Sequence, residues 1–186
     1  MKIEIISGSP RGNSITYRVA LHLQKALASF EGHTADIIDL RAIEMPQLQT
    51  VFTSEMEAPD NYKEVTRRML AAEAFVLVTP EYNGSYSAAL KNLVDHFPKQ
   101  HHKAFGIVTA STGALGGVRA ALQLQELVYA LFGIGSPYML VTPHVDKKFD
   151  ETGQLVDESF RRPVDIFVRE FLWLADRLAA KTTADL

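Results

Sequence analysis

The sequence predicts an α/β fold, with a doubly wound, five-stranded parallel sheet and helices on both of its faces. Apolar runs of strand length alternate with segments of helical periodicity along the whole chain, which is the order that produces parallel sheets. One run, residues 74–79 (AFVLVT), is almost continuously apolar, as expected of a strand buried on both faces. The chain has 186 residues and no internal repeat, so we expect one domain over residues 1–186.

Five strands are expected, each an apolar run bounded by polar or small residues. They cover residues 2–7, 35–40, 74–79, 104–109 and 138–142. Helices are expected where apolar residues recur every three or four positions. The first covers residues 14–29, the second carries Leu90, Leu93, Val94 and Phe97, the third carries Val118, Ala121, Leu122, Gln125, Val128 and Phe132, and the last carries Val164, Phe167, Val168, Phe171, Leu174 and Leu178.

Two features stand outside this pattern. Residues 44–61 contain Pro46 and Pro59 and show no sustained periodicity. A connection of this length is either an ordinary surface loop or part of a subunit contact or substrate rim. Trp173 lies off the apolar stripe of the last helix, which favours a place at a subunit interface.

Composition argues against several classes of function. A net charge of −3 and a pI near 6.1 disfavour a nucleic-acid partner. No apolar stretch reaches the roughly 20 residues of a membrane span, and Met1 leads directly into a strand without a signal-peptide pattern, so we expect a cytoplasmic protein with no membrane partner. The chain has no cysteine, which excludes disulfides, thiolate metal sites and a cysteine nucleophile. The histidines lack metal-ligand spacing, so no metal is expected, and any redox chemistry must belong to an organic cofactor.

A loop rich in Gly, Ser and Asn, residues 7–14 (SGSPRGNS), joins the first strand to the first helix. Free backbone N–H groups and the positive end of a helix dipole hold phosphate at such junctions, and an arginine adds a bidentate hydrogen bond. The loop matches neither common nucleotide pattern, GxGxxG or GxxxxGK[ST]. Candidate ligands are Ser9, Arg11, Asn13, Ser14, Ile15 and Thr16. The alternative is a plain turn, in which Ser9, Asn13 and Ser14 act only as turn and cap residues.

Two further loops follow the third and fourth strands, at residues 79–86 and 109–117. Open parallel sheets bind ligands beyond the carboxyl ends of their strands, so all three loops are expected at one edge. A phosphate loop beside two loops suited to a planar, hydrogen-bonding ring is what flavin mononucleotide (FMN) requires. The further candidate ligands are Pro80, Glu81, Tyr82, Asn83, Gly84, Ser111, Thr112, Gly113, Gly116 and Gly117. For Glu81, fixing the turn is as plausible a role as contacting the ligand.

At these residues the chain resembles the NADPH-dependent FMN reductase family, whose members include azo-dye, quinone and chromate reductases. The most specific motif is residues 80–85 (PEYNGS) followed by Leu90-Lys91-Asn92 and Asp95, supported by residues 8–14 and 111–117. The resemblance covers nearly the whole chain. It implies a flavodoxin-like fold with strand order 2-1-3-4-5, FMN held by the three loops, and homodimers or homotetramers. Structural roles are expected for Lys91, Asn92 and Asp95.

The chain departs from the family pattern at four places. Thr16 stands where Asn is frequent, Ser87-Ala88 replaces a frequent Pro-Gly, and His96-Phe97 stands where a Trp is common after Asp95. Gln125 occupies a position where many relatives carry Arg. The last difference bears on nicotinamide preference or on subunit pairing.

The resemblance implies an FMN-dependent oxidoreductase that passes hydride from NADPH or NADH through bound flavin to a small acceptor. The acceptor would be a quinone, an azo compound, a metal oxyanion or free flavin. No catalytic protein residue is expected, because the flavin supplies the chemistry. One alternative is a non-enzymatic electron carrier of the flavodoxin type, against which the Arg11 loop and the modest net charge of −3 argue. The other is a flavin-dependent sensor or scaffold, which only residues 44–61 would suit.

Overall fold

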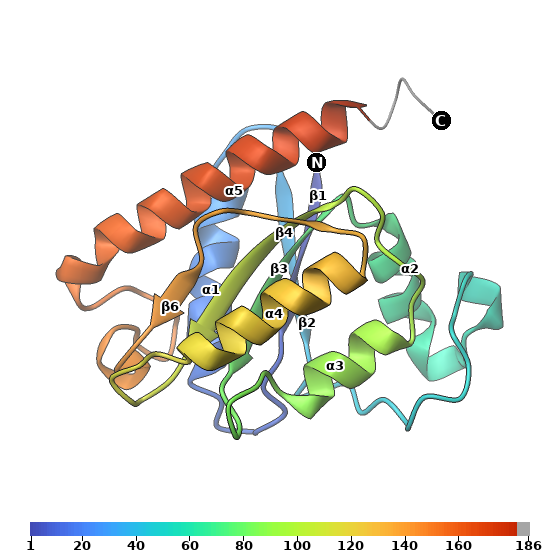
Figure 1. The fold of residues 1–186 in the computed structure, drawn as a ribbon, viewed down its shortest axis with the longest axis horizontal. Helices are drawn as coiled ribbons and strands as arrows, with labels where there is room; N and C mark the ends of the chain where they lie inside the picture. The colour runs from blue at the N-terminus through green and yellow to red at the C-terminus, as the bar shows by residue number, and fades with distance from the viewer. Residues whose placement is uncertain (182–186) are drawn as a thin grey trace.

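The computed structural model describes residues 1–181, and within them the chain forms one parallel sheet (Figure 1). Its strands run in the order β2-β1-β3-β4-β5, and β6 also pairs with β4. They are β1 (Lys2–Ser7), β2 (Thr34–Asp39), β3 (Ala74–Pro80), β4 (Ala104–Ala110), β5 (Ile134–Gly135) and β6 (Leu140–Thr142). The predicted doubly wound sheet and its strand order are confirmed.

Register brings the carboxyl ends of the central strands to one edge. Ser7 at the end of β1 pairs with Val78 of β3, and Pro80 at the end of β3 pairs with Ala110 of β4. Every residue of β3 and β4 is buried, which explains their continuous apolar character. The loops that leave these strands therefore start side by side.

Helices cover both faces of the sheet (Figure 1). They are α1 (Thr16–Ala28), α2 (Lys63–Ala71), α3 (Ala88–Asp95), α4 (Val118–Ala130) and α5 (Arg161–Lys181). One core cluster joins α1 and α5 to one face, with Phe167 and Phe171 fully buried. The other joins α2, α3 and α4 to the opposite face, around Phe75 and Phe105. None of the described helices is long and apolar enough to span a membrane.

The predicted fifth strand, residues 138–142, is present only in part. The outer side of β4 is covered by two short strands, β5 and β6, which pair with its first and last residues. Pro137 lies between them. Proline has no N–H to donate to the neighbouring strand, so it interrupts the ladder at this point.

The predicted apolar stripe of α4 is wrong at two of its positions. Leu122 is 52% exposed and Phe132, just beyond the helix, is 57% exposed. The buried residues of α4 are the predicted Ala121 and Val128 together with Ala120, Leu124 and Leu127, which the prediction did not include. Apolar residues occur on two sides of this helix, and periodicity alone does not tell which side is buried.

Periodicity also failed to indicate α2. This helix is highly charged and buries only Val65, Thr66 and Met69, so its apolar face is too narrow to be recognised from spacing.

Residues 44–61 form the long loop that the sequence predicts, with two short 3-10 turns, Glu55–Glu57 and Asp60–Tyr62. The loop is packed on the protein: Phe52 is buried and its N–H donates to the His96 carbonyl at 2.8 Å. The Asn92 side chain donates to the Met45 and Pro46 carbonyls at 3.0 and 2.8 Å. The structural role expected for Asn92 is to hold this loop on α3.

Candidate functional site

The loop after β1 is held close to β3 by Gly8. The Gly8 N–H donates to the Val78 carbonyl at 2.7 Å. A Cβ at Gly8 would lie only 2.8 Å from Leu90 Cδ1 and 3.0 Å from the Val78 oxygen. Only glycine lets the backbone pass here, so this position fixes where the loop leaves the sheet.

Beyond Gly8 the loop leaves its donors unused. The backbone N–H groups of Arg11, Gly12 and Asn13 donate to no other residue of the described chain. Ser9 and Thr16 are almost fully buried, at 2% and 5% exposure, and within residues 1–181 their hydroxyls also lack a hydrogen-bond partner. Unpaired N–H and O–H donors gathered beside the start of a helix are suited to binding an anion, so this cluster at the start of α1 is a candidate anion site.

Ser14 and Arg41 stabilise the loop after β1 through contacts with α1 and with Gly12. The Ser14 hydroxyl accepts from the Tyr17 N–H at 3.2 Å, which caps the first turn of α1. Arg41 lies 3.7 Å from the centre of the Tyr17 ring and reaches the Gly12 carbonyl at 3.5 Å. Hydrogen bonds from Arg41 to Asp39 raise the pKa of Arg41 and fix its guanidinium. Arg41 was not predicted from the sequence, although it follows β2 at the same edge.

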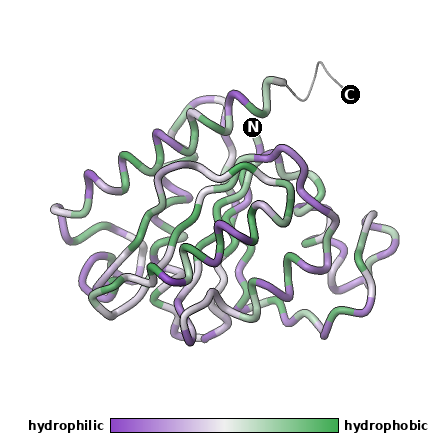
Figure 2. Tube along the Cα trace, in the orientation of Figure 1, coloured by the Kyte–Doolittle hydropathy of each residue, from purple (hydrophilic) through white to green (hydrophobic). Residues whose placement is uncertain are grey.

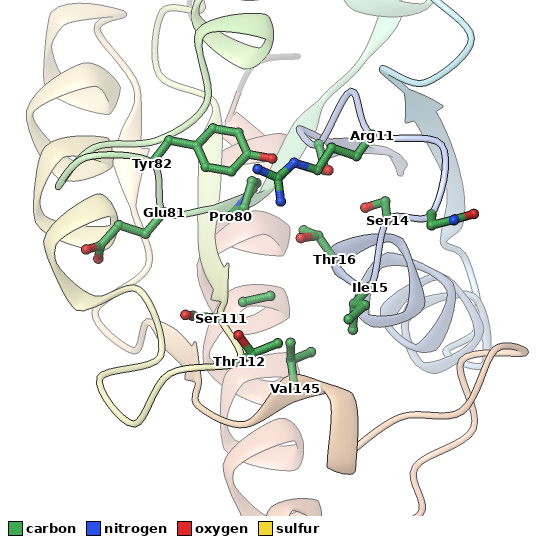
Figure 3. A pocket seen from close by; sticks show the side chains of 13 residues that line it. Arg11, Ser14, Ile15, Thr16, Pro80, Glu81, Tyr82, Ser111, Thr112 and Val145 are labelled. Carbon is green, nitrogen blue, oxygen red and sulfur yellow. The ribbon is translucent and has the colours of Figure 1, made fainter.

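Arg11 and Tyr82 lie at one end of the site, from two different loops (Figure 3). The guanidinium carbon of Arg11 is 4.9 Å from the centre of the Tyr82 ring. Among the described residues Arg11 forms no ion pair. Its charge is therefore available to an anionic ligand, and the guanidinium also lies over the Tyr82 ring.

Tyr82 is presented by a two-residue turn. The Tyr82 N–H donates to the Ser85 carbonyl at 2.8 Å, and the Ser85 N–H donates back at 3.1 Å. Asn83 and Gly84 both have positive φ, 52° and 81°, which is the conformation that an Asn-Gly pair favours in tight hairpins.

Ser87 ties the loop after β3 to the loop after β1. Its hydroxyl accepts from the Leu90 N–H at 3.1 Å, which caps α3, and donates to the Gly8 carbonyl. Its N–H donates to the Thr79 hydroxyl at 3.1 Å. The departure at Ser87 thus has a structural consequence, because this side chain links the loops after β1 and β3.

Glu81 acts as a helix cap. Its Oε2 accepts from the backbone N–H groups of Arg119 and Ala120 at 3.1 and 3.4 Å. Gly117, the residue before α4, has no side chain to serve this purpose, so a carboxylate from another loop takes the place of the missing cap. Figure 3 shows the Glu81 carboxylate directed away from the other labelled side chains.

In the third loop, Ser111 is fixed on both sides by backbone hydrogen bonds. Its N–H donates to the Thr142 carbonyl, and its carbonyl accepts from the Val145 N–H, both at 3.1 Å. Gly116 and Gly117 have positive φ, and a Cβ on them would lie 2.7 Å from Pro143 N and 2.9 Å from Thr109 Cβ. Close contacts within the chain therefore require glycine at both positions, without reference to a ligand.

Together the three loops enclose a cleft of about 180 Å³. Its lining includes the predicted residues Ser9, Arg11, Asn13, Ser14, Ile15, Thr16, Pro80, Glu81, Tyr82, Ser111 and Thr112. The remaining predicted residues, Asn83, Gly84, Gly113, Gly116 and Gly117, are outside the lining. Ala110 and Val145 line the cleft without having been predicted. Val145 could have been found, since it follows the last strand at the same edge.

Arg11 and Glu81 are the charged residues of this lining. Because the Glu81 carboxylate is engaged by α4, the cleft presents one free positive charge with unused N–H and O–H donors. No group of three or more His, Asp or Glu side chains in residues 1–181 is arranged to hold a metal ion.

Comparison with known proteins gives a consistent result. A family model described as NADPH-dependent FMN reductase matches residues 1–144. The FMN-dependent NADPH-azoreductase of Staphylococcus aureus is 31% identical over 179 residues, which is 92% of this chain and 94% of that protein. The enzyme of the same description from Staphylococcus haemolyticus is 31% identical over 180 residues, with the same coverage.

Solved structures show the same fold. FerB of Paracoccus denitrificans, a flavoenzyme NAD(P)H:(acceptor) oxidoreductase, superimposes with a TM-score of 0.74 at 22% identity, covering 95% of this chain and 97% of that one. A single-residue mutant of flavodoxin from Pseudomonas aeruginosa gives a TM-score of 0.56 at 23% identity, covering 92% of this chain and 99% of that one. At these identities the likeness concerns the fold, which is flavodoxin-like.

Proposed function

Because the chain belongs to the NADPH-dependent FMN reductase family, we propose that the cleft between its three loops is the FMN site. The protein is an FMN-dependent oxidoreductase that uses NAD(P)H and acts on small acceptors. Bound FMN supplies the redox chemistry of such a reaction, because a flavin takes a hydride from a reduced nicotinamide and passes electrons on.

The observation that supports this site best is the set of unused donors in residues 9–16. A phosphate monoester accepts several hydrogen bonds, and the free N–H groups of Arg11, Gly12 and Asn13 with the unpaired hydroxyls of Ser9 and Thr16 would supply them. The Arg11 guanidinium adds the matching charge. These residues fit the FMN phosphate without any further group.

The rest of the cleft suits the ribityl chain and one side of the ring. Pro80 and Tyr82 come from one loop, and Ser111 and Thr112 come from another, on different sides of the same opening (Figure 3). Ligand pockets usually reach about 300–1,000 Å³, so a cleft of about 180 Å³ leaves part of a flavin uncovered. An uncovered ring face is where a nicotinamide and an acceptor would bind in turn.

In this proposal the protein binds and orients, and no side chain acts as an acid or base. The loop after β1 holds the phosphate, and Ser87 keeps that loop in a fixed position relative to the loop of Tyr82. Arg41 stiffens the phosphate loop through Gly12 and Tyr17. The precision of the site would come from these contacts between loops.

The acceptor is proposed to be a small planar compound, an azo compound or a quinone, of which the first is suggested by the names of the staphylococcal relatives. We further propose a homodimer or homotetramer that works in the cytoplasm. Reduction at the expense of NAD(P)H and a chain without cysteine agree with a reducing compartment.

The test is a titration of the purified protein with FMN and riboflavin, followed by NADPH or NADH oxidation with a quinone or azo dye. We expect one FMN per chain and steady consumption of the reductant. FMN binding without turnover would favour an electron carrier, and no FMN uptake by the folded protein would refute the proposed site.

Kinetics test whether donor and acceptor share one face. Initial rates at several NADPH and quinone concentrations should give parallel double-reciprocal lines, because each reactant must leave before the other binds. Intersecting lines would mean that both bind together, and the shared-face proposal would then be wrong.

A further inference from the structure

The third loop of the cleft, which follows β4, begins without an apolar anchor of its own. Residues 111–113 (STG) carry no large apolar side chain, and Figure 2 shows that the loops at this edge are more hydrophilic than the strands they leave. Hydrophobic packing therefore does not determine how the start of this loop is oriented. Its orientation depends on hydrogen bonds with another segment of the chain.

That segment directly follows β6. The carbonyls of three successive loop residues accept from it: Ser111 from the Val145 N–H at 3.1 Å, Thr112 from the His144 imidazole Nδ1 at 3.1 Å, and Gly113 from the His144 N–H at 3.4 Å. Because a carbonyl oxygen can only accept, Nδ1 carries the proton in this contact. Figure 3 shows Thr112 and Val145 next to each other at the lower side of the cleft.

His144 has an unusual backbone conformation. Its φ and ψ are 48° and 43°, in the left-handed region that few residues other than glycine adopt. Its side chain makes no capping hydrogen bond to the 3-10 turn Val145–Lys147, although His144 is the residue before that turn. A strained conformation persists where the surrounding structure requires it. Here it brings the imidazole and the N–H of one residue onto two successive carbonyls of the third loop.

The orientation of these peptide groups decides which donors remain for a ligand. The C=O and N–H of a trans peptide group point in opposite directions, so the Thr112 N–H points away from Val145, which binds the Ser111 carbonyl. Within residues 1–181 the Thr112 N–H donates to no other group, whereas the N–H groups on either side of it are used within the chain. The start of the loop therefore keeps one free donor, on a residue that lines the cleft.

We propose that His144 is a positioning residue for the flavin ring. The Val145 N–H holds the peptide group before Thr112 and the His144 imidazole holds the one after it, so together they fix both backbone dihedral angles of Thr112 and direct its N–H to the ring. This role rests on the proposed function, because it takes the cleft to be the FMN site.

The consequence concerns the reduced form of the cofactor. A flavin ring gains electron density when it is reduced, and a donor that is held in place beforehand stabilises such charge without reorganisation. Hydrogen bonds and charges around the ring are how a protein adjusts the potential of a flavin. His144 thus raises the midpoint potential of bound FMN through the Thr112 N–H, although His144 itself is not among the residues that line the cleft.

The experiment compares two substitutions of His144. His144→Gly removes the imidazole and keeps the left-handed backbone, which glycine adopts freely. His144→Asn also tolerates this conformation, and its side-chain NH2 can replace the Nδ1 donor. In His144→Gly, reduced FMN should lose about 3- to 10-fold in affinity relative to oxidised FMN, the range of one neutral hydrogen bond. That lowers the midpoint potential by about 15–30 mV, at about 30 mV per tenfold for a two-electron couple. His144→Asn should restore it.

His102→Gly is the matched variant. His102 also has a positive φ, 60°, and it precedes β4 at the other edge of the sheet, so the midpoint potential should not change. In His144→Gly, FMN and riboflavin should lose affinity equally, because the third loop is not the phosphate loop. An unchanged potential in His144→Gly, a loss that His144→Asn does not restore, or a larger loss for FMN than for riboflavin would overturn the proposal.

Hydrogen exchange in the flavin-free protein separates this proposal from the proposed function. The Ser111 N–H, which donates to the Thr142 carbonyl, should exchange about tenfold faster in His144→Gly, because local opening of the loop costs less free energy. In His144→Asn it should exchange as in wild type. Equal rates in all three proteins would refute the part of His144 in ordering the loop. A wild type that binds no flavin would refute the proposed function, and the exchange rates would still decide whether His144 orders the loop.

Discussion

The two edges of the sheet carry clefts of opposite character. At the carboxyl edge the cleft is about 180 Å³ and has one free cation, Arg11. At the amino edge, where the strands begin, a cleft of about 390 Å³ lies between α2 and the starts of β1 and β2. Its charged lining residues are Lys2, Arg67 and Arg68 against Glu4, Asp36 and Glu64, so the charges balance.

The amino-edge charges also satisfy one another directly. Arg68 donates two hydrogen bonds to the Glu4 carboxylate, at 3.0 and 2.5 Å. Arg67 does the same to Glu64 at 3.0 and 2.6 Å. Burial raises the pKa of Glu4, against the opposing effect of Arg68. This cleft is larger, yet it has little charge left to offer a ligand.

Unused hydrogen-bond donors therefore identify the candidate site better than the volume of the cleft does. A polar group left without a partner in the folded chain costs free energy unless a ligand satisfies it, so a cluster of such groups indicates function. Paired charges at the amino edge contribute to stability instead. Substitutions at the two edges can therefore separate binding from stability.

The largest effect should come from Glu4→Ala at the amino edge. Removing one partner of a largely buried ion pair leaves the Arg68 charge without compensation, which typically costs about 3–5 kcal/mol. We expect about 3 kcal/mol in the free energy of unfolding, measured by urea denaturation, because the Arg68 side chain is 22% exposed. FMN affinity should not change. The control Arg67→Ala breaks an exposed pair and should leave stability nearly unaltered. A loss of FMN affinity in Glu4→Ala would show that the edges are not independent.

Arg11→Ala should have the reverse effect, on binding alone. A hydrogen bond to a charged group contributes about 1.5–3 kcal/mol, so FMN should bind roughly 10- to 100-fold more weakly. Riboflavin, which lacks the phosphate, should bind almost as before. Fluorescence quenching at fixed salt measures both affinities, with Arg67→Ala as the matched arginine. Equal losses for FMN and riboflavin would mean that Arg11 shapes the loop through Tyr82 instead of holding the anion.

Ser9→Ala should weaken FMN binding by about 3- to 10-fold, since a neutral hydrogen bond contributes about 0.5–1.5 kcal/mol. Its counterpart on α2 is Thr66→Val, because the Thr66 hydroxyl is buried without a partner and serves no proposed ligand. That substitution should leave FMN binding unchanged and should maintain or raise the midpoint of thermal unfolding. A drop in FMN affinity for Thr66→Val would mean that the effect of Ser9→Ala is not specific to the phosphate loop.

The smallest expected effects concern pH. His22 on α1 is half-buried beside Phe149, with ring centres 5.1 Å apart, and its Nδ1 lies 2.9 Å from the Gly153 carbonyl. Burial lowers the pKa of His22 from 6.5. Below pH 6.5 the imidazole is therefore protonated more fully in the unfolded chain than in the folded chain. The free energy of unfolding should therefore fall as the pH drops below 6.5. His22→Gln should remove this slope in urea titrations at several pH values.

Glu4 should give the opposite sign. Its folded pKa is raised above 4.5, so its favourable contribution is complete below pH 4.5 and is lost as the pH rises through the raised value. Comparing the pH profile of Glu4→Gln with that of His22→Gln isolates the two slopes. If both substitutions changed the pH dependence of the free energy of unfolding in the same direction, the pKa shift assigned to Glu4 or to His22 would be wrong.

Much of the fold and the site could be predicted from sequence because the relevant signals are local. The buried strands β3 and β4 appear as uninterrupted apolar runs, and the phosphate loop is recognisable from the small residues and Arg11 between a strand and a helix. Asn83-Gly84 likewise encodes its own tight turn, since both residues tolerate positive φ. Each of these features depends on neighbours within a few residues.

Contacts between residues that are distant in the chain depend on the tertiary structure and could not be predicted from local patterns. The Glu81 carboxylate caps a helix 38 residues away, Arg41 supports Gly12 from 29 residues away, and Gly116 is required by its approach to Pro143. The side of α4 that is buried was also decided there, because both sides are apolar in sequence and only packing against β4 distinguishes them. Local patterns specify which elements form, whereas burial and capping depend on which elements meet, and that is set by the energy of the whole fold.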